Sequence, residues 1–118
     1  MPKLAEFNKS ESRIQADCVR WYRNSFCLRH YNPRCMIFSV PNESNGSKAM
    51  KLIQTGLYPG VADLVICHRT RWLFVEVKTP TGIQSAKQRL FQEHCKQMNI
   101  QYELVRSLED FQEIIKKL

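Results

Sequence analysis

Residues 60–78 read GVADLVICHRTRWLFVEVK and contain two runs rich in β-branched and aromatic side chains. The two runs, Asp63–Cys67 and Trp72–Lys78, are joined by the polar tetrapeptide 68–71, and this pattern predicts a β-hairpin. Both runs are apolar at nearly every position, so we expect the hairpin to be buried on both faces. The charged residues within it therefore need an explanation, because an unpaired buried charge is costly.

Side-chain alternation and strand register bring three of these charges together. Successive side chains of a strand point to opposite faces, so Glu76 and Lys78 share a face about 6–7 Å apart. A turn of two or four residues pairs Cys67 with Trp72 and places Asp63 opposite Glu76, whereas an odd-length turn or a bulge breaks this register. Two carboxylates so close repel each other unless a proton or a cation lies between them. Carboxylate oxygens suit hard divalent cations, so we expect Mg²⁺ or Mn²⁺.

Glu11 is a candidate third acid. It precedes Ile14 by three residues in a helical pattern over about residues 8–26, so it lies on the face that the apolar residues turn inward. The alternative is a helix cap in which Glu11 pairs with Asn8. For the hairpin charges, the alternative to a metal site is a salt-bridged strand end. Three converging charges beside a positively charged surface favour the site.

The remaining segments predict helices and strands in alternation. Periodicity and turn signals indicate helices over residues 8–26, 47–55, 85–99 and from Ser107 onward, and strands over residues 36–40 and 101–105. The inner side of the third helix carries Leu90, Phe91, Cys95 and Met98. The order is α-β-(α)-β-β-α-β-α, so we expect a single α/β domain over residues 1–118 with a mixed central sheet flanked by helices.

Composition narrows the class of protein. The 18 Lys and Arg residues against 11 Asp and Glu leave a net charge of +7, which favours an anionic partner such as nucleic acid or simply keeps the protein soluble. No apolar run approaches the ~20 residues of a membrane helix, and no secretory leader is visible. Five cysteines without a Cys-x-x-Cys pair indicate reduced thiols in an intracellular protein, cytoplasmic in a prokaryotic or phage-infected cell. Cys27, His30 and Cys35 lack a second ligand pair for zinc.

These residues resemble a known family. Gly60-Val61-Ala62-Asp63-Leu64, then Glu76-Val77-Lys78, then Gln88 are similar to the Gly-x-x-Asp-Leu strand start, the Glu-Val-Lys strand and the helical Gln of the VRR-NUC group. That group belongs to the PD-(D/E)XK nucleases, which implies a restriction-endonuclease-like fold. The resemblance extends from the first predicted helix to the segment 107–110. It departs at Ala62, where the superfamily name places proline, but that side chain takes no part in metal chemistry.

The resemblance implies a role for each residue. Asp63, Glu76 and the carbonyl of Val77 would hold a divalent metal, and Glu11 would complete the site. Lys78 would assist the attacking water and stabilise charge on a phosphate.

The predicted role of Gln88 has a structural alternative. The resemblance implies that Gln88 orients the site or touches the scissile strand. However, Ser85-Ala86-Lys87-Gln88 also fits a capping box, in which Gln88 only closes the start of its helix. We expect that one side-chain conformation cannot fully satisfy both roles.

Contacts with DNA are predicted for residues that flank the site in the sequence. The candidates are Asn42, Lys48, Lys51, Lys87 and Arg89. Trp72 and Tyr58 are candidates for stacking on bases, although we expect Trp72 to pack in the core.

We therefore expect a Mg²⁺- or Mn²⁺-dependent, structure-specific endonuclease that hydrolyses DNA phosphodiester bonds without an organic cofactor. By the resemblance, small stand-alone members are homodimers that cut four-way (Holliday) junctions, which implies branched DNA and a role in repair or recombination. The alternatives are a flap, end-processing or duplex-cutting nuclease, a non-catalytic DNA-binding module, and a basic protein-interaction domain.

Overall fold

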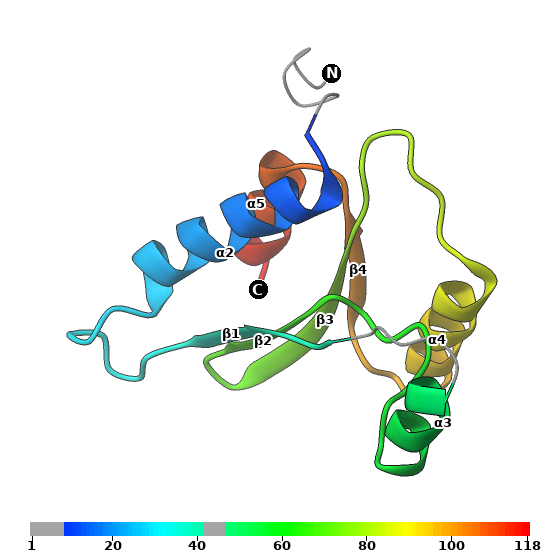
Figure 1. The fold of residues 1–118 in the computed structure, drawn as a ribbon. Coiled ribbons are helices and arrows are strands. Elements are labelled where there is room, and N and C mark those ends of the chain that lie inside the picture. The colour runs from blue at the N-terminus through cyan, green and yellow to red at the C-terminus, as the bar shows by residue number, and fades with distance from the viewer. Residues whose placement is uncertain (1–8, 42–46) are drawn as a thin grey trace.

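The computed structural model describes residues 9–41 and 47–118, with only the backbone described for residues 47–49. The elements are α2 (Glu11–Phe26), β1 (Met36–Ser39), α3 (Ser47–Gln54), β2 (Leu64–His68), β3 (Arg71–Val77), α4 (Ala86–Gln97), β4 (Tyr102–Val105) and α5 (Leu108–Lys116). This order confirms the predicted α-β-(α)-β-β-α-β-α arrangement (Figure 1).

The strands form one mixed sheet in the order β1-β2-β3-β4. Strands β1, β2 and β3 are antiparallel neighbours, and β4 runs parallel to β3. A parallel neighbour needs a crossover connection, and α4 supplies it between β3 and β4. The hairpin turn has two residues, Arg69 and Thr70, so Cys67 pairs with Trp72 as predicted.

Helices cover the two faces of the sheet unequally. The pair α2 and α5 packs on one face, and α4 lies on the other (Figure 1). The main core lies under α2 and α5, where apolar side chains from both helices meet those of the strands. Its most deeply buried members are Ile14, Cys18, Tyr22, Leu64, Ile66, Leu73, Val75, Val77, Val105 and Phe111. A smaller cluster of Val61, Ala62, Phe91 and Cys95 lies under α4.

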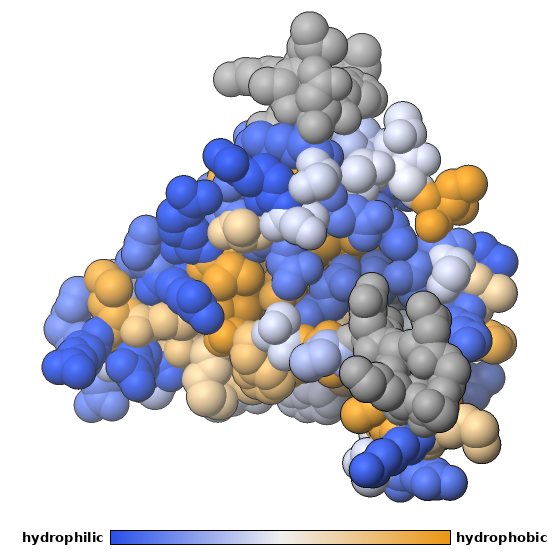
Figure 2. Space-filling view, in the orientation of Figure 1, coloured by the Kyte–Doolittle hydropathy of each residue, from blue (hydrophilic) through white to orange (hydrophobic). Residues whose placement is uncertain are grey.

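Part of the face that carries α4 is left open. Met36 and Phe38 are exposed there, and Trp72 is 48% exposed. Figure 2 shows a largely hydrophilic surface over α2, with apolar side chains gathered over the strands below it. The prediction that the hairpin is buried on both faces is therefore wrong at Trp72, because α4 covers only the β3–β4 end of this face. Leu90 of α4 and its C-cap residue Met98 are also exposed, contrary to expectation.

Cys18, Cys27, Cys35, Cys67 and Cys95 are free thiols. Within residues 9–41 and 47–118, no helix is both long and apolar enough to span a membrane.

Candidate active site

Asp63 and Glu76, called the acidic pair below, lie side by side where β2 begins and β3 ends. The observed register pairs Leu64 with Val75, so the preceding residue, Asp63, lies opposite Glu76, which confirms the predicted geometry. The two carboxyl groups are close enough that Asp63 contributes to raising the pKa of Glu76. Asp63 is fixed further because its Oδ2 accepts a hydrogen bond from the backbone N–H of Val77 at 2.7 Å.

Glu76 is fully buried, which is unusual for a carboxyl group. Its Oε2 accepts a hydrogen bond from Nε2 of Gln88 at 3.2 Å, and its Oε1 accepts a longer one from the Tyr102 hydroxyl at 3.5 Å. Burial raises the pKa of Glu76 to about 9, and the charge of Asp63 acts in the same direction while Lys78 opposes them. Without a cation beside it, the acidic pair therefore keeps a proton at neutral pH.

Lys78 and Glu11 lie next to the acidic pair. The Lys78 side chain is 8% exposed, and its Nζ is 3.8 Å from Oε1 of Glu11. The Glu11 side chain is 47% exposed, so it lies at the rim of the site rather than pointing inward as predicted. The N-cap of α2 is Ser10, whose hydroxyl accepts from the backbone N–H of Arg13, because the helix begins at Glu11. Asn8, the other half of the predicted cap, lies outside the described residues.

Gln88 contacts both the helix start and the acidic pair, which corrects our expectation that one conformation could not satisfy both. Its Oε1 accepts from the backbone N–H of Ser85 at 2.8 Å, while its Nε2 donates to Glu76. Both are satisfied because a side-chain amide has an acceptor and a donor on opposite sides. The Ser85 hydroxyl accepts from the Gln88 backbone and completes the capping box. The helix start therefore holds the amide in place against the acidic pair.

Gly60 lets the start of β2 approach α4. Its φ is +84°, and a Cβ at this position would lie 2.3 Å from the backbone oxygen of Lys87 and 2.8 Å from the nitrogen of Gln88. Only glycine tolerates both this backbone conformation and this close contact. The glycine of the sequence motif thus brings the segment before Asp63 against the helical turn that carries Gln88.

Arg106 and Tyr102 support the site, although the sequence analysis missed both. Nη1 of Arg106 donates to the carbonyls of Thr79 and Gly82, each at 2.7 Å, and so holds the loop that follows Lys78. The Tyr102 hydroxyl accepts from Gln84 at 3.0 Å and donates to Glu76. Tyr102 pairs with Phe74 in the parallel register, so alternation puts it on the Glu76 face, but this pairing cannot be read from local spacing in the sequence.

The donor set fits a hard divalent cation. The acidic pair offers carboxylate oxygens alone, and Mg²⁺ is commonly bound by one or two carboxylates together with water and substrate phosphates. Within the described residues, no group of three or more His, Cys, Asp or Glu side chains is arranged to hold a metal ion. The ligand roles of Asp63, Glu76, Glu11 and the Val77 carbonyl therefore stay predictions.

The residues predicted to contact DNA divide into two groups. Lys51, Lys87 and Arg89 are exposed, and Arg89 also donates from Nη1 to the carbonyl of Gln84 at 2.8 Å. Asn42 and the side chain of Lys48 lie outside the described residues. Tyr58 is exposed, and its hydroxyl is hydrogen-bonded to Nδ1 of His94 at 2.8 Å.

Comparison with known proteins gives one consistent result. A family model described as the VRR-NUC domain matches residues 9–109, a range that includes the whole site. A solved structure titled "VRR_NUC domain protein" has a TM-score of 0.73 to this chain at 16% sequence identity, covering 93% of this chain and 88% of that one. At this identity the likeness shows the fold alone. A search of the curated proteins finds no match.

Proposed function

Because the chain belongs to the VRR-NUC family of PD-(D/E)XK-like nucleases, we propose that it is a divalent-metal-dependent, structure-specific DNA endonuclease. The observation that carries this proposal is the buried Glu76 beside Asp63, with Lys78 adjacent. A module that only bound DNA would gain nothing from two acids near phosphates. The same two acids are useful where a cation joins them to a phosphate.

Each side chain has a role that follows from its contacts. Asp63 and Glu76 would hold the cation, with Asp63 oriented by the Val77 amide and Glu76 by Gln88. When bound, Mg²⁺ or Mn²⁺ would supply Lewis acidity that makes water a better nucleophile and offsets the charge of the phosphate. Lys78 would place its positive charge where negative charge grows on the phosphoryl oxygens. Glu11 would form an ion pair with the Lys78 ammonium, or it would add an oxygen ligand to the cation from the rim of the site.

Branched DNA and a homodimer are the finer parts of this proposal. Resolution of a four-way junction requires two symmetric cuts, and a homodimer provides two copies of the site. The described surface of α3 exposes Met50, Leu52 and Ile53, and surface of this apolar kind is common at protein interfaces. The molar mass in solution, measured by light scattering during size-exclusion chromatography, tests the dimer separately from the chemistry.

A cleavage assay tests the proposed reaction. The protein is incubated with labelled four-way junction, flap and linear duplex DNA, in Mg²⁺, in Mn²⁺ and in EDTA. We expect metal-dependent cutting of the junction by the parent protein, and cutting at least 10³-fold slower by Asp63→Asn and Lys78→Met. Glu113→Gln, which changes an exposed carboxylate on α5, is the matched control and should cut at the parent rate.

The outcomes separate the alternatives. If only flap or duplex DNA is cut, the proposed junction substrate is wrong, but the proposed metal-dependent hydrolysis stands. Binding without cutting in any metal, or equal cutting by the two site variants, would show that the chain is not a nuclease that uses these residues.

A further inference from the structure

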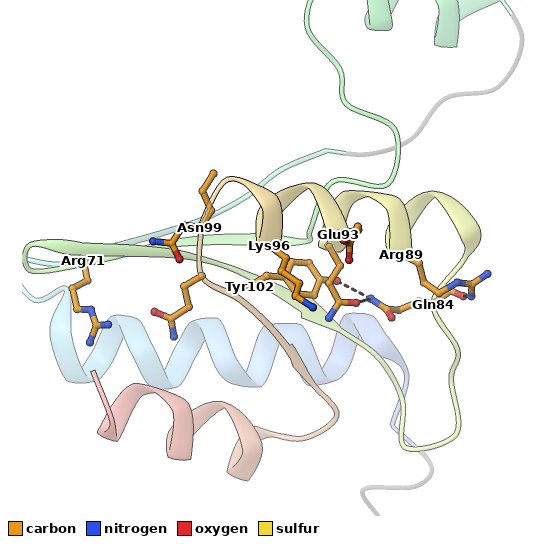
Figure 3. Close-up of a pocket in the computed structure, with 10 residues that line it drawn as sticks. Arg71, Gln84, Arg89, Glu93, Lys96, Asn99 and Tyr102 are labelled. Atoms are coloured by element: carbon orange, nitrogen blue, oxygen red, sulfur yellow. Dashed lines mark hydrogen bonds between the residues drawn. The ribbon is translucent and has the colours of Figure 1, made fainter.

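A polar groove runs along α4 and the edge strand β4, outside the acidic pair. Its volume is about 880 Å³. Figure 3 shows Arg71 at one end, Gln84 and Arg89 at the other, and Lys96 and Tyr102 between them. Pockets for small organic ligands are lined mainly by apolar side chains, whereas this one is lined mainly by charged and amide-bearing ones. The groove therefore suits an extended, charged partner better than a small apolar molecule.

The charge of the groove is positive. Arg71, Arg89 and Lys96 line it together with one acid, Glu93, which leaves a formal charge of +2. Within the described part of the chain, neither Arg71 nor Lys96 forms an ion pair with a carboxylate. Both side chains are exposed, so their charges are available to an anionic partner.

The groove leads directly to the acidic pair. Tyr102 lines it, and the hydroxyl of this residue contacts Glu76. Gln84 also lines it and donates to the same hydroxyl. Arg71 lines the far end and begins the strand on which Glu76 lies five residues later, about 16 Å away at ~3.3 Å per residue; by alternation its side chain leaves the strand on the Leu73 face. One nucleic-acid strand advances ~3.4 Å per nucleotide, so this length corresponds to about five nucleotides.

We propose that this groove receives the sugar–phosphate backbone of the nucleic-acid strand that leads into the acidic pair. The inference rests on the proposed nuclease function, because that function requires a phosphate chain at Glu76. Arg71, Arg89 and Lys96 contact phosphates, and amide side chains that line the groove (Gln92, Asn99 and Gln101) donate to phosphate oxygens. Such contacts fix the position and direction of the strand without reading its sequence.

Binding measurements with a charge-matched control test the groove. Arg71→Gln/Lys96→Gln removes two charges from it, and Lys116→Gln/Lys117→Gln removes two from the last residue and the C-cap of α5, neither of which lines the groove. Affinity for labelled junction and duplex DNA is measured by fluorescence anisotropy in EDTA at several salt concentrations. We expect the groove variant to bind at least tenfold more weakly at 0.1 M salt, with a salt slope smaller by about 2. The α5 control should stay within about twofold of the parent.

The outcomes distinguish this inference from the proposed function. If the parent protein cuts DNA but the groove variant binds as tightly as the α5 control, the groove inference is wrong and the nuclease assignment stands. If the parent cuts nothing in any metal but the groove variant alone loses binding, the groove is a nucleic-acid site and the assigned chemistry fails. No DNA binding by the parent overturns both.

One further arm tests the class of the partner. A polyglutamate peptide and a single-stranded oligonucleotide of equal charge are compared as competitors for the labelled DNA. We expect the oligonucleotide to compete at least tenfold better, because only it carries the regular phosphate spacing. Equal competition would overturn the assignment to nucleic acid and indicate an acidic protein partner.

Discussion

The two faces of the sheet differ in what they bury. The face under α2 and α5 is closed by two helices, and its side chains Leu73, Val75 and Val77 are buried among other apolar groups. The opposite face has α4 over one end only, where Glu76 is buried, and its other end leaves Trp72 exposed. One strand, β3, contributes alternate residues to both faces.

Because of this difference, alternate residues of β3 serve two purposes: those on one face stabilise the fold, and those on the other face form the candidate site. On the closed face, burial of apolar area stabilises the fold. On the α4 face, burial of Glu76 opposes its ionisation and so costs stability at neutral pH, while it shapes a site for a cation. Neighbouring residues of β3 should therefore respond in opposite ways to substitution.

The largest expected effect comes from Glu76→Gln. The substitution keeps the shape of the side chain and removes its charge, so we expect DNA cleavage to fall by about 10³-fold. The free energy of unfolding at pH 8 in EDTA should rise, because Glu76 is ionised in the unfolded chain and must take up a proton on folding, a cost that glutamine does not have. Val75→Ala, one residue earlier on the closed face, should show the reverse: a stability loss of about 1–3 kcal/mol with cleavage retained. If Glu76→Gln destabilises the fold as much as Val75→Ala does, the proposed difference between the two faces is wrong.

Adjacent residues Leu73 and Trp72 test the coverage of the two faces. Leu73 is fully buried under α2 and α5, so Leu73→Ala should lower the free energy of unfolding by about 2–5 kcal/mol. Trp72 is the larger side chain but is half exposed, so Trp72→Ala should cost about 1 kcal/mol or less. Urea denaturation followed by circular dichroism measures both. A larger loss for Trp72→Ala would mean that another part of the chain or a second copy covers that end of the face.

These faces also show how far the sequence alone could go. The alternation of β3 and an even-length turn were enough to predict that Asp63 lies opposite Glu76, because register is a property of local spacing. The helix cap at Ser85 and the helix start at Ser107 followed from short-range patterns in the same way. Local rules therefore located the acidic pair and the helix that supports it.

The predictions for Trp72 and Gln88 were wrong for a different reason. Alternation shows which side chains share a face, but the length and position of a covering helix decide whether they are buried. Trp72 was expected in the core because its strand is apolar, yet α4 does not extend far enough to bury that residue. Gln88 was assigned one role or the other because sequence spacing does not show that its amide spans two partners. The Tyr102 contact and the groove depend on the parallel pairing of β3 with β4, which joins segments far apart in the chain.

The pH dependence of stability tests the burial of Glu76 directly. Its pKa is about 9 in the folded protein and near 4.5 when exposed, so between these values the folded state holds more protons than the unfolded state. Stability in EDTA should therefore fall as pH rises from about 5 to 9, by at most ~1.4 kcal/mol per pH unit. Burial lowers the pKa of His68, which adds an opposite trend near pH 6, so the parent must be compared with Glu76→Gln at each pH. Equal slopes for the two proteins would show that Glu76 is not protonated in the folded state.

The smallest expected effect is that of Tyr102→Phe, which removes the long hydrogen bond to Glu76 and the bond accepted from Gln84 but keeps the ring against Phe91. We expect kcat to fall about three- to tenfold with KM unchanged, because a supporting group orients the carboxylate without binding DNA itself. Loss of a donor to the ionised form raises the pKa of Glu76, so at limiting Mg²⁺ the rise of activity with pH should move to higher pH. Tyr31→Phe removes an exposed hydroxyl elsewhere and should change neither quantity. A uniform loss of activity at every pH would mean that Tyr102 acts through packing alone, whereas a shifted profile identifies its hydroxyl as the group that tunes the acidic pair.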